Sequence, residues 1–331
     1  MSLRDVSVEE GRGSVPVGGR PLTIGLVNLM PDATFIATES QFRQLLTAGA
    51  TRAAFQLKLF TLPSLARAGS VLDYANARYE TTEQLYEQSL DGLIITGTEP
   101  KQADLRREPY WADMTRLIDW AAINTASTIF SCLVAHVAVL HLDGVERRRM
   151  PGKLTGVMAC AKTGQHWLTD GAPEVWHTPH SRWNDVSEAD LTAHGYQVLV
   201  RSEVAGADLF VKTVGSRFVF LQGHPEYDGD SLQKEYRRDV RRFLTGESQA
   251  HPSLPANVFA PEVAEQLQEL AQRAIATRDE GVYDAVSRLA LAGPVAPHWR
   301  PDAVRLYRNW LSHLSDREHA ATLTADLVAP L

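Results

Sequence analysis

Short apolar runs alternate with longer amphipathic segments through the first 142 residues of the chain. The apolar runs have the length of buried strands, which we expect at residues 22–28, 55–62, 92–96 and 127–131. The segments between them place apolar residues three and four positions apart and predict helices at residues 34–46, 83–89, 110–123 and 133–142. A regular succession of strand and helix predicts an α/β fold, with a mostly parallel sheet and helices on both faces.

The pattern becomes less regular elsewhere. Residues 63–78 have weak periodicity, and we expect an ordered loop there. Shorter apolar runs after residue 150 predict strands at residues 154–158, 196–201, 208–213 and 217–222. Further helices are expected on either side of a Pro-rich hinge at 251–261, at residues 231–244, 263–276, 283–291 and 301–314.

The breaks in this pattern do not bracket a second apolar core. We therefore expect one domain at residues 21–331, whose helical C-terminal part covers residues 250–331. Residues 1–20 are rich in Gly, Ser and charge, and we expect them to form a flexible N-terminal tail.

Composition narrows the classes of function. A net charge of −7 and a pI near 5.9 argue against a nucleic-acid partner. No apolar run reaches the roughly 18 residues of a membrane span, and the N-terminus lacks the apolar region of a signal peptide. The two cysteines, Cys132 and Cys160, do not make a disulfide scaffold. We therefore expect a cytoplasmic protein whose partners are small molecules.

Cys132 lies between a predicted buried strand and a predicted helix. Such a residue sits on a sharp turn above the sheet, where the helix N-terminus favours a thiolate and its free N–H groups can bind an oxyanion. A buried apolar cysteine is the alternative interpretation of Cys132 taken alone. Cys160 lacks this context, and we expect it to be structural.

His224 follows the predicted strand at 217–222, and Glu226 comes two residues later. The carboxylate could bind the far nitrogen of the imidazole and fix its tautomer, and a turn histidine beside a surface glutamate is the alternative. Because Cys132 is expected at the same edge of the sheet, we favour a Cys132–His224–Glu226 nucleophilic site.

Several motifs make the chain similar to a known family. They are IGLVNLMPD at 24–32, DGLIITG at 91–97, STIFSC at 127–132, GKLTGV at 152–157, TPHSRW at 178–183, FLQGHPEYD at 220–228 and EYRRDV at 235–240. On these motifs, the chain resembles the homoserine O-succinyltransferases of methionine biosynthesis from Ile24 to Leu244. Trp299-Arg300 and Asn309-Trp310-Leu311 extend the resemblance to the last helix.

The resemblance implies a fold like that of class I glutamine amidotransferases and a ping-pong acyl transfer from acyl-CoA to L-homoserine. It implies that Cys132 carries the acyl group, that His224 is the base and that Glu226 orients His224.

The family's substrate-binding residues correspond to Lys153, Ser181, Arg182 and Arg238. A guanidinium such as that of Arg238 suits an amino-acid carboxylate, which it can bind with two hydrogen bonds. The resemblance also implies a homodimer. We expect no cofactor besides acyl-CoA as a co-substrate and no metal, because His177 and His180 come without further ligands at a suitable spacing.

The chain departs from the family's pattern near the expected pocket. His136 replaces an amide on the helix after Cys132. By direct alignment, the position that selects the acyl group is Lys101, whose charge suits a succinyl carboxylate. If the loop is shifted, Glu99 takes this position and acetyl-CoA becomes the donor. The acceptor could also be another amino alcohol, such as L-serine.

Two other classes of function remain open at this stage. One is a glutamine amidotransferase-like amidase that uses the same Cys132, His224 and Glu226. The other is a non-catalytic binding protein on this fold, which the altered helix after Cys132 and the altered loop near Lys101 would allow.

Overall fold

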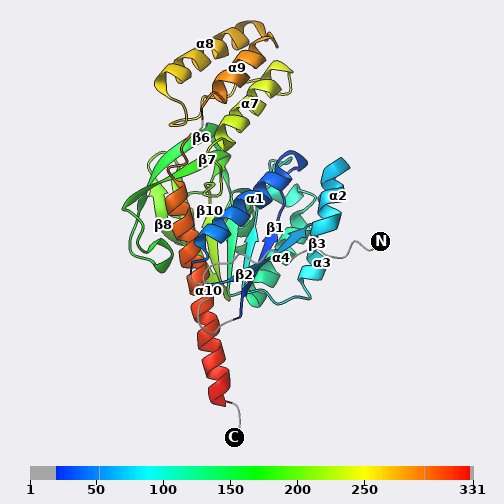
Figure 1. Cartoon of the computed structure of the whole chain (residues 1–331), viewed down its shortest axis with the longest axis vertical. Helices are drawn as coiled ribbons and strands as arrows, with labels where there is room; N and C mark the ends of the chain where they lie inside the picture. The colour runs from blue at the N-terminus through cyan, green and yellow to red at the C-terminus, as the bar shows by residue number, and fades with distance from the viewer. Residues whose placement is uncertain (1–19, 52, 294, 329–331) are drawn as a thin grey trace.

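The computed structural model describes residues 20–328 except 52 and 294, with side chains described as far as residue 316. These residues form one ten-stranded sheet of order β3-β2-β1-β4-β5-β10-β9-β8-β6-β7 (Figure 1). The strands from β3 to β10 in this order are parallel, and those from β10 to β7 are antiparallel. The prediction of an α/β fold with a mostly parallel sheet is confirmed. The predicted tail lies outside the described residues, apart from Arg20, which pairs with Asp91.

The strands are β1 Leu22–Val27, β2 Phe55–Thr61, β3 Glu80–Thr81, β4 Gly92–Ile95, β5 Ser127–Ser131, β6 Arg148–Lys162, β7 Val175–Asp185, β8 Gln197–Ser202, β9 Gly206–Val214 and β10 Ser216–Leu221. The α-helices are α1 Asp32–Gly49, α2 Gly69–Arg78, α3 Thr82–Leu85, α4 Trp111–Asn124, α5 Leu133–Asp143, α6 Glu188–Ala193, α7 Ser231–Leu244, α8 Pro261–Thr277, α9 Val282–Ala290 and α10 Arg300–Val328. Short 3₁₀ turns occur at Leu105–Arg107 and Trp167–Thr169.

Helices cover both faces of the parallel part of the sheet. Side chains of α1 and α10 pack on one face, and those of α4 and α5 pack on the other. The central strands β1, β4 and β5 are buried over nearly their whole length and are mostly apolar, which explains why they appear in the sequence as apolar runs.

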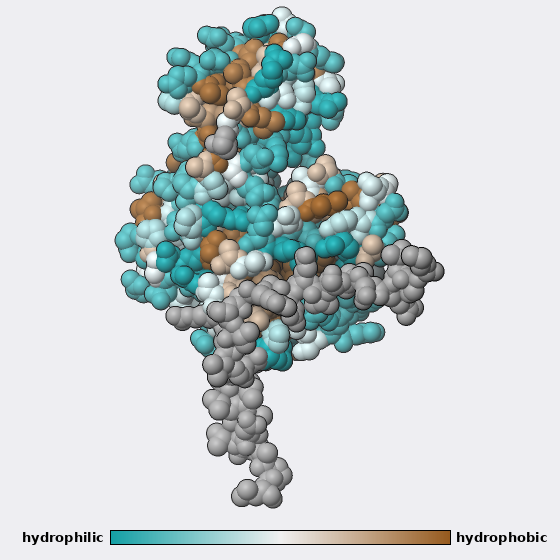
Figure 2. Space-filling view, in the orientation of Figure 1, coloured by the Kyte–Doolittle hydropathy of each residue, from teal (hydrophilic) through white to brown (hydrophobic). Residues whose placement is uncertain are grey.

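The helices α7, α8 and α9 pack around an apolar cluster of their own. They form a unit at one end of the molecule, and Figure 2 shows a hollow in the surface between this unit and α1. The helical character of the C-terminal part is confirmed, whereas its assignment to a single domain stays a prediction. Among the residues that the structure describes, none of the helices combines the length and the apolar character of a membrane span.

Two predictions of local structure were wrong, and β3, β7 and α6 were not predicted. Residues 69–78 form α2 rather than a loop, and only Ala75 of this helix is buried, so the segment has no apolar stripe. The strand at 154–158 extends over residues 148–162, where it pairs with β7. The buried side chains of β7 are mostly polar, so its sequence does not show the alternation of apolar residues that marks a strand.

The last helix continues beyond residue 314 and is anchored to the sheet through Trp310. The indole ring is fully buried, and its Nε1 donates a hydrogen bond to Oγ of Ser127 at 3.0 Å. Gly92 makes room for it, because a Cβ at that position would lie 2.7 Å from Cη2 of Trp310. The C-terminal helix is therefore part of the main core.

We expect Trp310→Ala to lower the free energy of unfolding by about 3–5 kcal/mol, because it leaves a large cavity between α10 and the sheet. Asp316→Ala, an exposed change on the same helix, should cost less than about 0.5 kcal/mol. Urea denaturation of both variants measures the difference. Equal stability of the two would show that α10 is not anchored through Trp310.

Candidate active site

Cys132 lies on the turn between β5 and α5, as predicted. Its backbone has φ 53° and ψ −114°, a conformation that is strained for a residue with a side chain. The amide of Cys132 donates to the carbonyl oxygen of Leu221 at 2.7 Å, which ties the end of β5 to the end of β10. This strand–turn–helix geometry presents a nucleophile above the edge of a sheet.

The space beside Cys132 is kept open by Gly97. A Cβ at residue 97 would lie 3.4 Å from both Cβ of Cys132 and the backbone nitrogen of Leu133. Leu133 is the first residue of α5, so its N–H has no acceptor within the helix. This N–H can therefore stabilise an oxyanion formed on a substrate carbonyl that Cys132 attacks.

His224 and Glu226 stand next to Cys132, as the sequence predicted. The side chain of Cys132 lies beside His224 on one side, close enough to interact with the imidazole. On the other side, its Nδ1 lies 2.8 Å from Oε1 of Glu226, and both residues are buried. The structure therefore brings all three predicted catalytic residues together.

The surroundings of His224 favour its protonated form. Burial alone would lower the pKa of this imidazole, but the negative charges of Cys132 and Glu226 raise the pKa well above its usual range. The ring also stacks on Tyr227, with centroids 4.3 Å apart. This environment can hold a proton on the imidazole between two steps of a reaction.

Tyr227 connects the catalytic residues to a cluster of charged side chains. Its hydroxyl donates to Oε1 of Glu235 at 2.5 Å. Lys153 contacts Oε2 of Glu235 at 3.3 Å, and the hydroxyl of Ser181 donates to the same carboxylate. Three of these side chains lie on different elements, β6, β7 and α7, so Glu235 is the centre of the cluster.

Two more residues of α7 complete this cluster. Lys153 contacts Oδ2 of Asp239 at 2.6 Å, and Arg238 contacts Oδ1 of Asp239 at 2.8 Å. The Arg238 side chain is 41% exposed, so its guanidinium remains accessible to a ligand. Burial would raise the pKa of the Glu235 carboxyl, but the charges of Lys153 and Arg238 lower the pKa to about 2.

Arg182 is the one predicted substrate-binding residue that the structure does not bring to this cluster. Adjacent residues of a strand point to opposite faces, and Ser181 is the one that faces α7. The guanidinium of Arg182 is buried on the other face, where it donates to Oδ1 of Asp185 at 2.9 Å and to the carbonyl oxygen of Ala205.

The loop after β4 carries both candidate selectors of the acyl group. The exposed side chain of Glu99 pairs with Arg242 of α7 at 2.9 Å. The side chain of Lys101 is exposed, and its backbone N–H donates to Oε1 of the buried Glu108 at 2.6 Å. Arg147 donates to the carbonyl oxygens of the next two residues, so the loop is held by side chains outside it.

His136 of α5 is fully enclosed and does not reach the catalytic residues. Its Nε2 lies 2.8 Å from Oε1 of Gln222, whose amide nitrogen in turn donates to the carbonyl oxygen of Ala207. Burial lowers the pKa of His136 to about 3, so the ring is neutral. His136, which stands where the family has an amide, therefore belongs to the residues that support the site from beneath.

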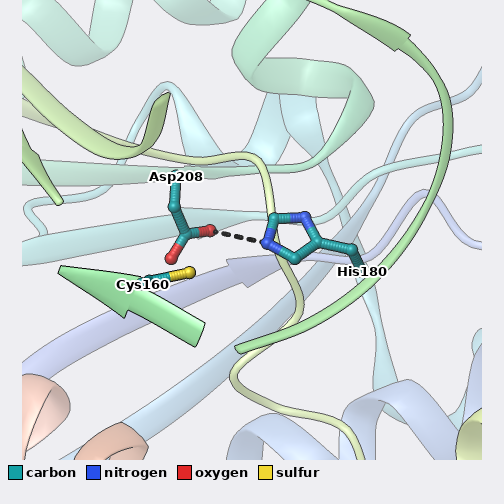
Figure 3. A group of neighbouring side chains, drawn as sticks. All are labelled: Cys160, His180 and Asp208. Atoms are coloured by element: carbon teal, nitrogen blue, oxygen red, sulfur yellow. Dashed lines mark ion pairs between the residues drawn. The ribbon is translucent and has the colours of Figure 1, made fainter. Parts of the chain in front are cut away.

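His180 lies far inside the protein, with Cys160 and Asp208 as neighbours (Figure 3). The three potential metal-ligand atoms lie within 4.8 Å of one another. Burial raises the pKa of the Cys160 thiol and lowers that of His180, so both groups are neutral without a ligand.

Four residues of the site were not assigned a role from the sequence: Gly97, Tyr227, Glu235 and Asp239. All four belong to motifs that carried the resemblance, DGLIITG, FLQGHPEYD and EYRRDV. The spacing of Glu235, Arg238 and Asp239 places them on one face of a helix, and this spacing could have identified the group from the sequence.

The fold and these side chains define an α/β protein with a cysteine–histidine–glutamate nucleophilic site beside a cluster of opposite charges. A family model described as Homoserine O-succinyltransferase matches residues 4–320. The chain therefore belongs to the homoserine O-succinyltransferase family, whose members are transferases.

Individual proteins show the same similarity. The homoserine O-succinyltransferase of Methylorubrum extorquens is 45% identical over 298 residues, which cover 90% of this chain and 88% of that protein. The homoserine O-succinyltransferase of Rhodopseudomonas palustris is 45% identical over 296 residues, with 89% of each chain covered.

Solved structures with a similar fold include two glutamine amidotransferases. The one from Methylobacillus flagellatus has a TM-score of 0.49 at 15% identity and covers 89% of this chain and 95% of its own. The one from Thermotoga maritima has a TM-score of 0.48 at 13% identity and covers 82% of this chain and 100% of its own.

The low pKa of Glu235 predicts a pH dependence of stability. Its stabilising contribution is complete above the unfolded pKa of about 4.5 and is lost as the pH falls towards 2. A shift of this size corresponds to about 3 kcal/mol. Glu235→Gln should therefore lose less unfolding free energy than the wild type between pH 6 and pH 3, as urea titrations would measure. Glu269→Gln, an exposed change on α8, should follow the wild type; a Glu235→Gln slope equal to that of wild type would refute the assignment.

Proposed function

We propose that this protein transfers a succinyl group from succinyl-CoA to the hydroxyl of L-homoserine, through a thioester on Cys132. The observation that carries the proposal is the contact of Cys132, His224 and Glu226, joined through Tyr227 to a cluster of both charges. The names of relatives that are 45% identical over most of the chain support the choice of substrates.

In the first half-reaction, His224 takes the proton of the Cys132 thiol. The thiolate attacks the thioester carbonyl of succinyl-CoA, and the N–H of Leu133 stabilises the oxyanion. The tetrahedral intermediate then expels CoA, which leaves as a thiol with the proton from His224. Glu226 holds the imidazole on Nδ1 throughout, so that Nε2 faces the sulfur.

In the second half-reaction, the same imidazole acts on the acceptor. His224 takes the proton of the homoserine hydroxyl, and the oxygen attacks the acyl carbon. The Cys132–acyl bond breaks, the thiolate takes the proton back from His224, and the ester leaves. Because one base serves both steps in turn, CoA must depart before the acceptor reacts, which is a ping-pong sequence.

The charge cluster suits an amino acid, which carries one carboxylate and one ammonium group. Arg238 can bind the carboxylate with two hydrogen bonds, and Glu235 can bind the ammonium group. In the described structure these groups neutralise each other, with Lys153 between Glu235 and Asp239. A zwitterionic ligand can exchange these contacts without leaving a buried charge unpaired.

Succinyl-CoA and acetyl-CoA differ by a carboxylate, which the loop after β4 can recognise. We favour succinyl because the side chain of Lys101 is exposed and forms no ion pair with another described residue, whereas the Glu99 carboxylate is already paired with Arg242. The proposal includes acyl-CoA as a co-substrate, with no further cofactor or metal. It also includes a homodimer and a cytoplasmic location. These parts of the proposal rest on the resemblance or on composition.

The proposal is tested by the initial rate of CoA release with varied succinyl-CoA and L-homoserine. We expect parallel lines in double-reciprocal plots, and no turnover for Cys132→Ala. Acetyl-CoA and L-serine in the same assay distinguish the alternative donor and acceptor. Turnover that persists in Cys132→Ala, or release of ammonia from glutamine by the wild type without CoA chemistry, would contradict the proposal.

Under the proposed function, Arg238 should affect the half-reaction with L-homoserine and not the half-reaction with succinyl-CoA. We expect Arg238→Ala to raise the KM for L-homoserine by about 10–100-fold, because it removes a charge-assisted pair with the carboxylate. The first-turnover release of CoA should stay within about threefold of wild type. The KM of Arg238→Lys should fall between those of the wild type and Arg238→Ala. Arg241→Ala, an exposed arginine on the same helix, is the control. An equal loss in both half-reactions would remove the role assigned to Arg238.

A further inference from the structure

The turn at residues 222–224, which carries His224, is attached to strands β9 and β7 by three backbone N–H groups. The amide of Gln222 donates to the carbonyl oxygen of Asp208 at 2.8 Å, and that of Gly223 donates to Oδ1 of Asp208 at 3.2 Å. The amide of His224 donates to the carbonyl oxygen of Pro179 at 2.7 Å. Asp208 of β9 thus holds two of the three residues of this catalytic turn.

The catalytic turn also lies in tight contact with the same residues. A Cβ at Gly223 would lie 2.7 Å from Oδ1 of Asp208 and 2.3 Å from Cγ2 of Thr178. Any movement of the Asp208 carboxylate therefore changes the position of the turn.

The Asp208 carboxylate is itself held on two sides, and the residue is 1% exposed. Its Oδ2 accepts a hydrogen bond from the hydroxyl of Thr178 at 2.9 Å. Its Oδ1 lies 3.3 Å from Nε2 of His180, and Figure 3 shows the two side chains pointing toward each other. The approach does not have the geometry of a hydrogen bond, and Nε2 of His180 has no hydrogen-bond partner among the described residues.

Arg182 fixes the orientation of His180. Its Nε donates to Nδ1 of His180 at 3.4 Å, so the imidazole proton is on Nε2 and faces Asp208. Thr178, His180 and Arg182 alternate along β7 and share one face of the strand, opposite to Ser181. One strand therefore supports the catalytic turn with one face and contacts the charge cluster with the other.

A metal ion fits this group poorly. Both oxygens of the Asp208 carboxylate already accept hydrogen bonds from the protein, and so does Nδ1 of His180. The positive charge of Arg182 also acts on Cys160, His180 and Asp208, so a divalent cation among them would be repelled.

We propose that Asp208, which accepts a hydrogen bond from Thr178 and lies beside His180, is a positioning residue that sets the catalytic turn and thereby the distance from His224 to Cys132. This inference rests on the role of His224 in the proposed function. Proton transfer between the imidazole and the thiol requires contact, and a displacement of about 1 Å caused by a remote change can cost about 100-fold in rate.

The experiment measures CoA release in the first turnover with succinyl-CoA, for the full-length wild type and for variants. Asp208→Ala should slow this step by about 10–100-fold, at an unchanged half-saturating concentration of succinyl-CoA. Asp208→Asn keeps an oxygen in reach of the Gly223 amide, so it should stay within about threefold of wild type and keep its pH profile. Asp208→Asn would lose the first-turnover rate as Asp208→Ala does if the charge of the carboxylate, rather than its oxygen, were required.

Thr125→Val is the matched control, because it removes buried hydrogen bonds with Thr128 and Ser216 near the amino ends of β5 and β10, whereas the catalytic turn follows the carboxyl end of β10. It should lose stability in urea denaturation, as Asp208→Ala does, yet keep its first-turnover rate within about threefold. If Asp208→Ala does not fold, Asp208→Asn still decides the matter.

Several results would overturn the inference. They are a loss of more than tenfold in Asp208→Asn, an equal loss in Thr125→Val and Asp208→Ala, or a stoichiometric transition metal in the purified wild type. No release of CoA by the wild type would overturn the proposed function and this inference together. Normal release by both the wild type and Asp208→Ala would overturn the inference alone.

Discussion

The left-handed backbone at Cys132 is the constraint on which the site depends. It turns the chain from β5 into α5 within one residue, which exposes the thiol and frees the N–H of Leu133. The cost of this conformation is of the order of 1–3 kcal/mol, which the surrounding sheet must offset. The hydrogen bond from the Cys132 amide to the carbonyl oxygen of Leu221 contributes to this stabilisation. Leu221 is the last residue of β10 and comes two residues before Gly223, which precedes His224. The thiol and the imidazole are thus placed by the same pair of adjacent strands.

In the proposed function, the antiparallel extension of the sheet supplies the groups that bind the amino-acid acceptor. Strand β7 presents Ser181 to Glu235 on one face and His180 to Asp208 on the other. Tyr227 then joins the two regions, because it stacks on the catalytic histidine and donates to Glu235. Under the proposed mechanism, short contacts through Tyr227 would therefore couple binding of the acceptor to the position of His224, which would serve as the base in both half-reactions.

Sequence reasoning succeeded where burial dominates. Strands β1, β4, β5 and β10 are almost wholly buried and appear as continuous apolar runs, and Cys132 and His224 come just after the ends of two of them. It failed where polar contacts replace apolar ones. The buried face of β7 is mostly polar, so the strand was missed, and Arg182 was grouped with Ser181 although neighbouring residues of a strand point apart. Knowledge of that one strand would have separated the two residues.

The central claim is that Cys132 carries the acyl group between the two substrates. Intact-protein mass spectrometry after brief mixing with succinyl-CoA, without acceptor, tests it most directly. We expect a mass gain of one succinyl group, located on the peptide that contains Cys132 and removed when L-homoserine is added. A mass gain that persists in Cys132→Ala, or CoA release in the presence of L-homoserine without any acylated intermediate, would contradict the covalent mechanism.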